Sequence, residues 1–212
     1  MDDTLTKAAT HKLVGGALCL DFVNTLGAAT SDQPTEYLAT YAALVGWSEH
    51  AGLLTHADAT HLIAQATQRP ADGRTALQDA QRLRVVLHRV FVAVAQGTQP
   101  PTEELALLNT RLATAAGQTR VMPTSAGYAW TWADDPDALD RMLWPIVRSA
   151  AELLVTGDLT RVRVCSGERC GWVFLDTSKN RSRRWCDMQD CGNVAKVRRF
   201  RTRQHEVHNH GE

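Results

Sequence analysis

Four cysteines near the C-terminal end of the chain have the spacing of metal ligands. Cys165 and Cys170 enclose four residues, fifteen residues follow, and Cys186 and Cys191 again enclose four. A tetrahedral zinc ion takes four ligands at about 2.3 Å from each thiolate, and two short loops that each present two thiolates can supply them. Four thiolates also leave no coordination position for water or substrate. We therefore predict one structural zinc ion held by all four residues, rather than four merely buried cysteines.

The fifth cysteine, Cys19, stands alone in an apolar run and is expected in the core. The sequence has no signal-peptide pattern and no run of about 20 apolar residues, which favours a cytoplasmic protein that does not enter a membrane. Cysteines in a reducing cytosol bind metals more often than they pair as disulfides.

Basic residues gather around the cysteines. Residues 161–204 hold twelve Lys and Arg against four acids, a formal charge of +8, whereas the whole chain is neutral and the remainder therefore carries −8. Such a concentration favours a polyanionic partner, and an arginine-rich helix can enter the major groove of DNA. The predicted nucleic-acid contacts are Lys179, Arg181, Arg183, Arg184, Lys196, Arg198, Arg199, Arg201 and Arg203.

Several alternatives compete with the DNA interpretation. The basic face can be merely solvated, or it can dock on the acidic remainder of the chain. RNA is a further candidate partner if Trp172, Phe174 and Trp185 are exposed for base stacking. In the DNA interpretation, Val194, Val197 and Phe200 seat the last helix on the zinc module while its arginines face outward, as three-residue spacing permits.

A polar cluster interrupts the apolar run near the N-terminus. Asp21, Asn24 and Thr25 fall within one helical turn, and buried polar side chains need partners. Two interpretations stay open: these residues line a pocket for a small-molecule effector, or they form an internal hydrogen-bond network. The histidines have no recognisable catalytic partners and no phosphate-binding glycine loop is present, so we expect no enzyme activity.

The predicted fold is mainly α, with residues 1–158 forming a helical domain. Between 17 and 116, apolar residues recur at spacings of three and four, the helical period. Predicted helices cover 17–26, 34–51 (ended by Gly52), 56–68 (capped by Thr55), 74–96, 103–116 and 136–157, the last with a kink at Pro145. A β-hairpin is predicted within 120–133, around the turn at 125–127.

A small α+β zinc finger of treble-clef type is predicted for residues 159–204. Strands at 161–164 and 172–175 flank the first cysteine pair, and Phe174 and Trp185 are expected to cover the metal. Zinc replaces a hydrophobic core in so short a module. Residues 205–212 are expected to be a flexible tail.

The residues around the cysteines resemble the CGNR zinc-finger family. The resemblance rests on residues 165–170, 171–176 (GWVFLD), 183–186 (RRWC) and 191–193 (CGN). Residues 18–26 (LCLDFVNTL) resemble the start of the helical ABATE domain, which accompanies this finger and is described as a stress-induced transcription regulator domain. The two resemblances cover nearly the whole chain. Val194 stands where the naming motif has arginine, so either a nucleic-acid contact is missing here or Val194 packs in the fold.

Together these observations predict a zinc-containing, DNA-binding transcription regulator. Its helical domain would sense a small molecule, and a homodimer is compatible with this function. The competing hypothesis is a small-molecule-binding or catalytic helical protein in which the finger is only a structural element, and the exposed arginines distinguish the two.

Overall fold

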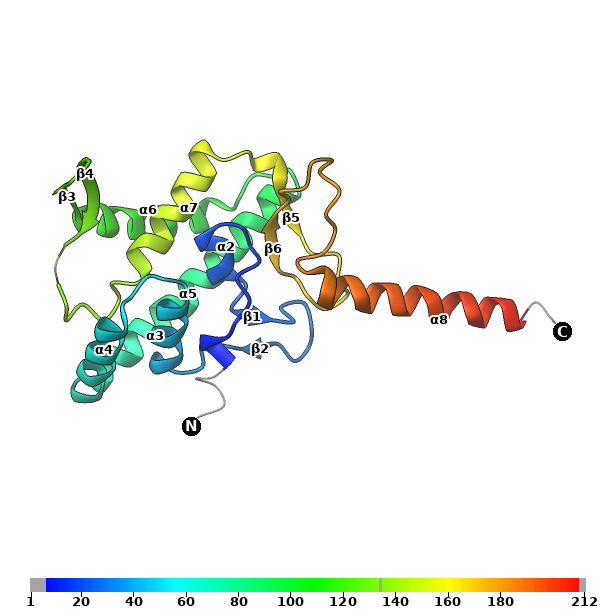
Figure 1. The fold of residues 1–212 in the computed structure, drawn as a ribbon, viewed down its shortest axis with the longest axis horizontal. Coiled ribbons are helices and arrows are strands. Elements are labelled where there is room, and N and C mark those ends of the chain that lie inside the picture. The colour runs from blue at the N-terminus through cyan, green and yellow to red at the C-terminus, as the bar shows by residue number, and fades with distance from the viewer. Residues whose placement is uncertain (1–6, 134, 210–212) are drawn as a thin grey trace.

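The computed structural model describes residues 7–133 and 135–209, with side chains described through residue 202. Most of the chain forms a helical body, from which one long helix projects at the C-terminal end (Figure 1). The helices are α2 (Leu18–Val23), α3 (Tyr41–His50), α4 (His56–Gln68), α5 (Pro70–Ala95), α6 (Thr102–Gly117), α7 (Leu143–Thr156) and α8 (Asn193–Asn209). The predicted mainly helical fold is confirmed.

Helix α5 is the central element of the body, where it contacts α2, α3, α4 and α6. Leu83, Leu87 and Phe91 recur every four residues along its buried face. The helix begins at Pro70, before the predicted start at residue 74, because the fixed φ of proline suits a first helical position. Gly97 follows its end with a φ of +69°, a backbone conformation that favours glycine.

The predicted cap of α4 is confirmed. Thr55 Oγ1 accepts a hydrogen bond from the Asp58 amide at 3.1 Å, and the Asp58 carboxylate accepts one from the Thr55 amide at 3.0 Å. This reciprocal pair satisfies two amides that have no partner inside the helix.

The prediction of a helix from residue 34 is wrong for its first part. Thr35–Glu36 forms strand β2, which pairs antiparallel with β1 (Leu26–Gly27) in a two-stranded ribbon. Helix α3 begins only at Tyr41, because Thr40 Oγ1 accepts a hydrogen bond from the Ala43 amide at 3.1 Å and so caps the helix there.

Helix α7 also begins later than predicted, at Leu143 rather than at residue 136. Residues 136–142 form turns, in which Leu139 and Met142 are nevertheless buried in the core. Pro145 consequently lies in the first turn of α7, where the nitrogen of proline interrupts no intrahelical hydrogen bond. The physical basis for the predicted kink at Pro145 is therefore absent.

The predicted β-hairpin is present. Strand β3 (Thr119–Thr124) pairs antiparallel with β4 (Gly127–Trp132), with Val121 opposite Trp130. At the base of the hairpin the Trp132 ring lies 6.2 Å from the Trp144 ring of α7.

The two strands of the predicted finger are confirmed as β5 (Val162–Val164) and β6 (Val173–Leu175), an antiparallel pair. Val162 and Val173 are fully buried in the main hydrophobic core together with residues of the helical body. The finger is therefore built into the body rather than tethered beside it.

Helix α8 packs at its base against the turn at Met188–Gly192 and then projects away from the body (Figure 1). Residues 205–209, predicted as the start of a tail, continue this helix, and residues 210–212 lie outside the described residues. Within the described part of the chain, no helix has the length and apolar character needed to cross a membrane.

Candidate metal centre and nucleic-acid surface

The four cysteine sulfurs predicted as zinc ligands converge on one point. All four Sγ atoms lie within 4.8 Å of one another. The Sγ of Cys186 lies 3.6 Å from that of Cys170 and 3.7 Å from that of Cys191. Zinc–sulfur bonds of about 2.3 Å in a tetrahedron require sulfur separations of about 3.8 Å. The four cysteines thus form a site that fits one zinc ion, as the spacing predicted, and the ion would link the two loops.

The first cysteine loop follows β5 and closes tightly around the sulfurs. The amides of Gly167 and Cys186 donate hydrogen bonds to Cys165 Sγ at 3.4 and 3.3 Å, which stabilises negative charge on that sulfur. A Cβ atom at Gly167 would lie 3.0 Å from the Sγ of Cys191. Glycine at this position therefore lets the two loops approach closely enough to share a metal.

The partly buried Arg183 makes contacts within the fold beside the metal centre, and its predicted contact with nucleic acid stays a prediction. Its guanidinium lies 4.4 Å above the buried Phe174 ring. The same group donates hydrogen bonds to the carbonyls of Trp185 at 3.0 Å, Val14 at 3.2 Å and Cys186. A guanidinium with this many partners fixes the second cysteine loop against the N-terminal segment.

Asp176 is a buried structural residue that the sequence analysis did not single out. Its carboxylate accepts hydrogen bonds from the Ser178 hydroxyl at 2.5 Å, the Ser178 amide at 2.9 Å and the Arg183 amide at 3.0 Å. These hydrogen bonds, that from the Ser178 hydroxyl first, hold the pKa of Asp176 below its ordinary value. The sequence signal that could have indicated its structural role is its position directly after the apolar GWVFL run, where a strand ends.

The aromatic residues proposed for RNA stacking are largely engaged within the fold. Phe174 is fully buried beside the cysteines, and the Trp172 indole donates a hydrogen bond to the Leu26 carbonyl at 2.9 Å. Trp185 is half-buried, with the Arg184 guanidinium 5.4 Å from its ring centre. The expected cover of the metal by Phe174 and Trp185 is confirmed.

The remaining predicted nucleic-acid contacts lie mostly on the surface. Arg181 is partly used within the fold, because it pairs with Asp158 at 3.1 Å and donates to Thr160 at 2.8 Å. The Arg203 side chain lies outside the described residues. Besides Arg181, the exposed predicted cations are Lys179, Arg184, Lys196, Arg198, Arg199 and Arg201.

Two further basic residues belong to this region and were not predicted as contacts. Arg169 is exposed on the first cysteine loop. The preceding residue, Glu168, forms an ion pair with Arg198 of α8. Lys12 Nζ donates hydrogen bonds to a carboxylate oxygen of Asp187 and to one of Asp190, both at 2.6 Å. These hydrogen bonds raise the pKa of Lys12, and that from Lys12 to Asp187 lowers the pKa of Asp187. Arg169 was detectable by its place between two ligands, whereas only folding brings Lys12 to the second cysteine loop.

The apolar residues of α8 do not seat the helix on the zinc module. Val194, Val197 and Phe200 are exposed, at 68, 49 and 61% of their full surface. The prediction that this stripe packs against the finger is therefore wrong, and Val194 does not pack as a substitute for the arginine of the motif. Helical spacing correctly places the three residues on one face of α8. This face stays exposed because α8 projects away from the helical body.

The polar cluster near the N-terminus is an internal hydrogen-bond network, the second of the two interpretations. Asn24 is fully buried, and its amide group donates to the Val173 carbonyl and accepts from the Val173 amide, both at 2.9 Å. Thr25 accepts a hydrogen bond from Arg84 at 3.2 Å. Asp21 accepts one from the Gly15 amide at 2.7 Å, and burial raises its pKa.

None of the three lines either of the two described pockets. The structure thus gives no support to the prediction that Asp21, Asn24 and Thr25 bind an effector.

Other contacts lock the finger to the helical body. His88 Nε2 lies 2.9 Å from the Gly171 carbonyl, and the Ala29 amide donates to the Cys170 carbonyl at 3.0 Å. Gly171 has a φ of +67°, and a Cβ there would lie 2.7 Å from Thr30. A larger residue at Gly171 would therefore push the β1–β2 ribbon, in whose connecting segment Thr30 lies, away from the first cysteine loop.

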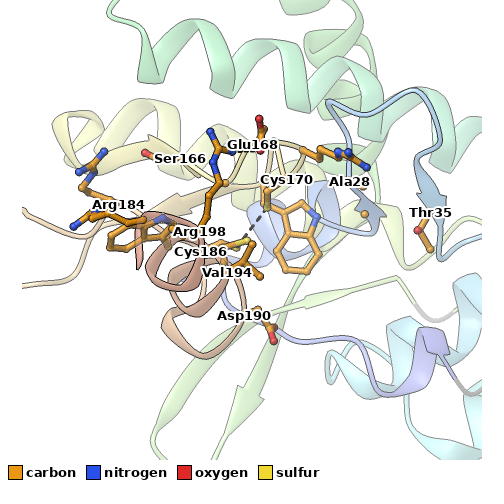
Figure 2. Close-up of a pocket in the computed structure, with 18 of the residues that line it drawn as sticks. Ala28, Thr35, Ser166, Glu168, Cys170, Arg184, Cys186, Asp190, Val194 and Arg198 are labelled. Atoms are coloured by element: carbon orange, nitrogen blue, oxygen red, sulfur yellow. Dashed lines mark hydrogen bonds and ion pairs between the residues drawn. The ribbon is translucent and has the colours of Figure 1, made fainter. Parts of the chain in front are cut away.

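A groove of about 1210 Å³ lies between that ribbon, the two cysteine loops and the first turns of α8. Figure 2 shows Arg184 and Arg198 on one side of this groove, with Ala28 and Thr35 across from them.

Two family models match the chain. The family described as "putative stress-induced transcription regulator" (ABATE) matches residues 16–157, and the CGNR zinc-finger family matches residues 161–204. A comparison with curated proteins finds no match. The ABATE match covers more than half of the chain, and the zinc-finger match coincides with the four-cysteine site. The chain therefore belongs to the ABATE family and carries a CGNR zinc finger at its C-terminal end.

Proposed function

We propose that this protein is a zinc-dependent, DNA-binding transcription regulator whose α8 helix and second cysteine loop contact DNA. The observation that carries the proposal is the placement of exposed cations along a projecting helix. Lys196, Arg198, Arg199 and Arg201 all lie on the surface of α8, and Arg184 lies on the adjacent loop. A helix free of the body on most of its length is accessible to the major groove, which admits one α-helix.

Local electrostatics favour this surface for phosphate. Lys12 pairs with both Asp187 and Asp190 and so offsets one of their two negative charges. The zinc and four thiolates carry about −2 together, but they lie at the base of the helix rather than along it. Arg198 pairs with Glu168, whereas no ion pair between described residues involves Arg199 or Arg201 of α8.

The rigid junction with the helical body supports a regulatory role. Because Asn24 and His88 hold the strand and loop of the finger directly, a ligand that shifts the body would also shift the finger. The family description names stress-induced transcription, and this is the cellular setting that we propose. We also propose that the helical body senses a small molecule.

A salt series tests DNA binding. If about six phosphates are neutralised, log K for a duplex should fall with log salt at a slope near −5. We expect the Arg198→Ala, Arg199→Ala, Arg201→Ala variant to reduce the magnitude of that slope by about three. The readout is fluorescence anisotropy of a labelled duplex with the zinc-loaded protein.

A matched control makes the same change of charge at three exposed arginines outside the zinc finger. Arg74, Arg82 and Arg120 are exposed on the helical body. Their triple alanine variant should retain the parent slope. If the α8 variant and the parent share one slope, the basic segment serves the fold and the competing hypothesis of a purely structural finger is favoured.

A further inference from the structure

The groove beside the zinc site has walls from both families matched by the chain. Gly27, Ala28, Thr35 and Tyr37 come from the ribbon of the ABATE region, and the opposite wall comes from the cysteine loops and α8. Its volume of about 1210 Å³ exceeds the roughly 300–1,000 Å³ typical of small-molecule sites. A molecule in this groove would touch the body and the helix that we propose contacts DNA.

Positive charge dominates the rim of the groove. Arg169, Arg184, Arg198 and Arg199 line it, against two carboxylates, Glu168 and Asp190. Arg198 pairs with Glu168, and Asp190 is held by Lys12 at 2.6 Å. Among the ion pairs between described residues, none involves Arg169, Arg184 or Arg199. Three guanidinium groups are thus available to an anionic ligand.

Aromatic and apolar side chains also line the groove. Tyr37, Trp172 and Trp185 contribute aromatic surface, and Val194 contributes an apolar edge from the first turn of α8. Three of the zinc-binding cysteines also line the groove, and their thiolates disfavour negative charge close to them. The anionic group of a ligand is therefore expected beside the arginines, and its uncharged ring against the aromatic residues.

We propose that this groove binds a planar aromatic molecule carrying one anionic group, and that such a molecule competes with DNA for Arg184 and Arg199. The competition rests on the function proposed above, whereas the binding itself does not. A carboxylate, sulfonate or phosphate can each accept paired hydrogen bonds from a guanidinium, so these three groups share the required chemistry.

The binding is tested with the fluorescent probe anilinonaphthalene sulfonate, an aromatic anion, on the zinc-loaded protein without DNA. We expect saturable binding and at least about tenfold weaker binding of the uncharged analogue N-phenylnaphthylamine, because a charge-assisted hydrogen bond is lost. Arg199→Glu should weaken probe binding at least about tenfold for the same reason, whereas Lys196→Glu, on the same helix but outside the groove wall, should not.

Steric variants give an independent readout. Val194→Trp fills the groove from an exposed position and should reduce probe affinity. Val197→Trp places the same side chain on α8 away from the groove wall and should leave probe affinity unchanged. Trp130→Thr removes exposed apolar surface from the β3–β4 hairpin and should leave binding unchanged. The proposal is overturned if the parent protein binds no probe, if each variant weakens binding as much as its control, or if Trp130→Thr abolishes binding.

Competition is measured separately. Saturating probe should weaken duplex binding by the parent protein and have no effect on duplex binding by Val194→Trp. If the protein binds no duplex at all, the proposed function fails while probe binding still decides whether the groove is a site. If probe and duplex bind the parent together without mutual effect, the competition is wrong.

Discussion

Asn24 joins the helical body to the zinc finger with one side chain. It satisfies both backbone groups of Val173 in a fully buried position. We expect Asn24→Ala to lower the free energy of unfolding by about 2 kcal/mol or more, because a buried amide and a buried carbonyl lose their partners. Urea unfolding of the zinc-loaded protein measures this. Asn180→Ala, at an exposed position, is the control, and equal stability of the two variants would contradict the prediction.

His11 makes the junction sensitive to acid. Its ring packs against Tyr37 and Trp172, and burial lowers the pKa of His11 from 6.5 to about 4. The native state keeps it neutral while the unfolded chain binds a proton near pH 6.5, so stability falls as pH decreases from 6.5 towards 4.

The size of this acid effect is testable. Because His11 stays neutral in the native state, its contribution should lower the free energy of unfolding at pH 5 by about 2 kcal/mol relative to pH 7. In His11→Gln, the loss of stability between pH 7 and pH 5 should be smaller by that amount, whereas zinc loss affects both proteins alike. Urea unfolding at the two pH values provides the comparison, and identical pH dependence would show that His11 does not titrate in this window.

Val194 occupies the position of the arginine in the zinc-finger motif and lies exposed beside the proposed DNA surface. We expect Val194→Arg to steepen the salt dependence of duplex binding by about 0.9 in slope, without a change in melting temperature. Val85→Arg adds the same charge at an exposed site on α5 and should leave the slope unchanged. If the slope of Val194→Arg stays at the parent value, position 194 does not face phosphate.

At the scale of the elements, α8 stands apart from the rest of the molecule. Its apolar side chains Val194, Val197 and Phe200 are exposed, and among the described elements it packs mainly against the turn at its base. Isolated helices of this length are marginally stable in water, so a binding partner would stabilise it. An element that contributes little to the fold is suited to a binding role.

Truncation separates these two contributions. A chain ending at Ala195 should keep its zinc and change the free energy of unfolding by less than about 0.5 kcal/mol, because few buried contacts are lost. It should no longer bind duplex. A chain ending at Gln204 retains the described basic residues of α8 and should bind. Duplex binding by the shorter chain would place the DNA surface elsewhere.

At the scale of the whole molecule, the body and the finger share one core. Val162 and Val173 of the finger strands are buried with the helices of the body. Zinc removal should therefore destabilise the whole chain rather than the finger alone. A structural zinc ion contributes several kcal/mol or more to folding, so we expect the melting temperature to fall by more than about 10 °C.

Calorimetry with and without a chelator tests this coupling. One transition is expected in both states, and an excess of zinc should restore the higher melting temperature. Two transitions after chelation, with that of the helical body at its original temperature, would mean that the body folds independently of the finger.

Local signals in the sequence were sufficient for the metal ligands, the cap at Thr55, the central helix, the hairpin and the two finger strands. Each depends on residues close together in the chain, since cysteine spacing, capping and hydrophobic period act within a few turns. The starts of α3 and α7 were less predictable, because Thr40 caps one helix where proline suggested an earlier start, and turns precede the other.

Contacts between distant segments could not be read from local patterns. Arg183 and Arg199 look alike in the sequence, yet one is enclosed by carbonyls beside Phe174 and the other faces the groove. Asn24 meets Val173 only because α2 and β6 pack together. The residue types and their spacing limit which local structures form, but the side chain's environment depends on which distant surfaces the folded chain brings against it.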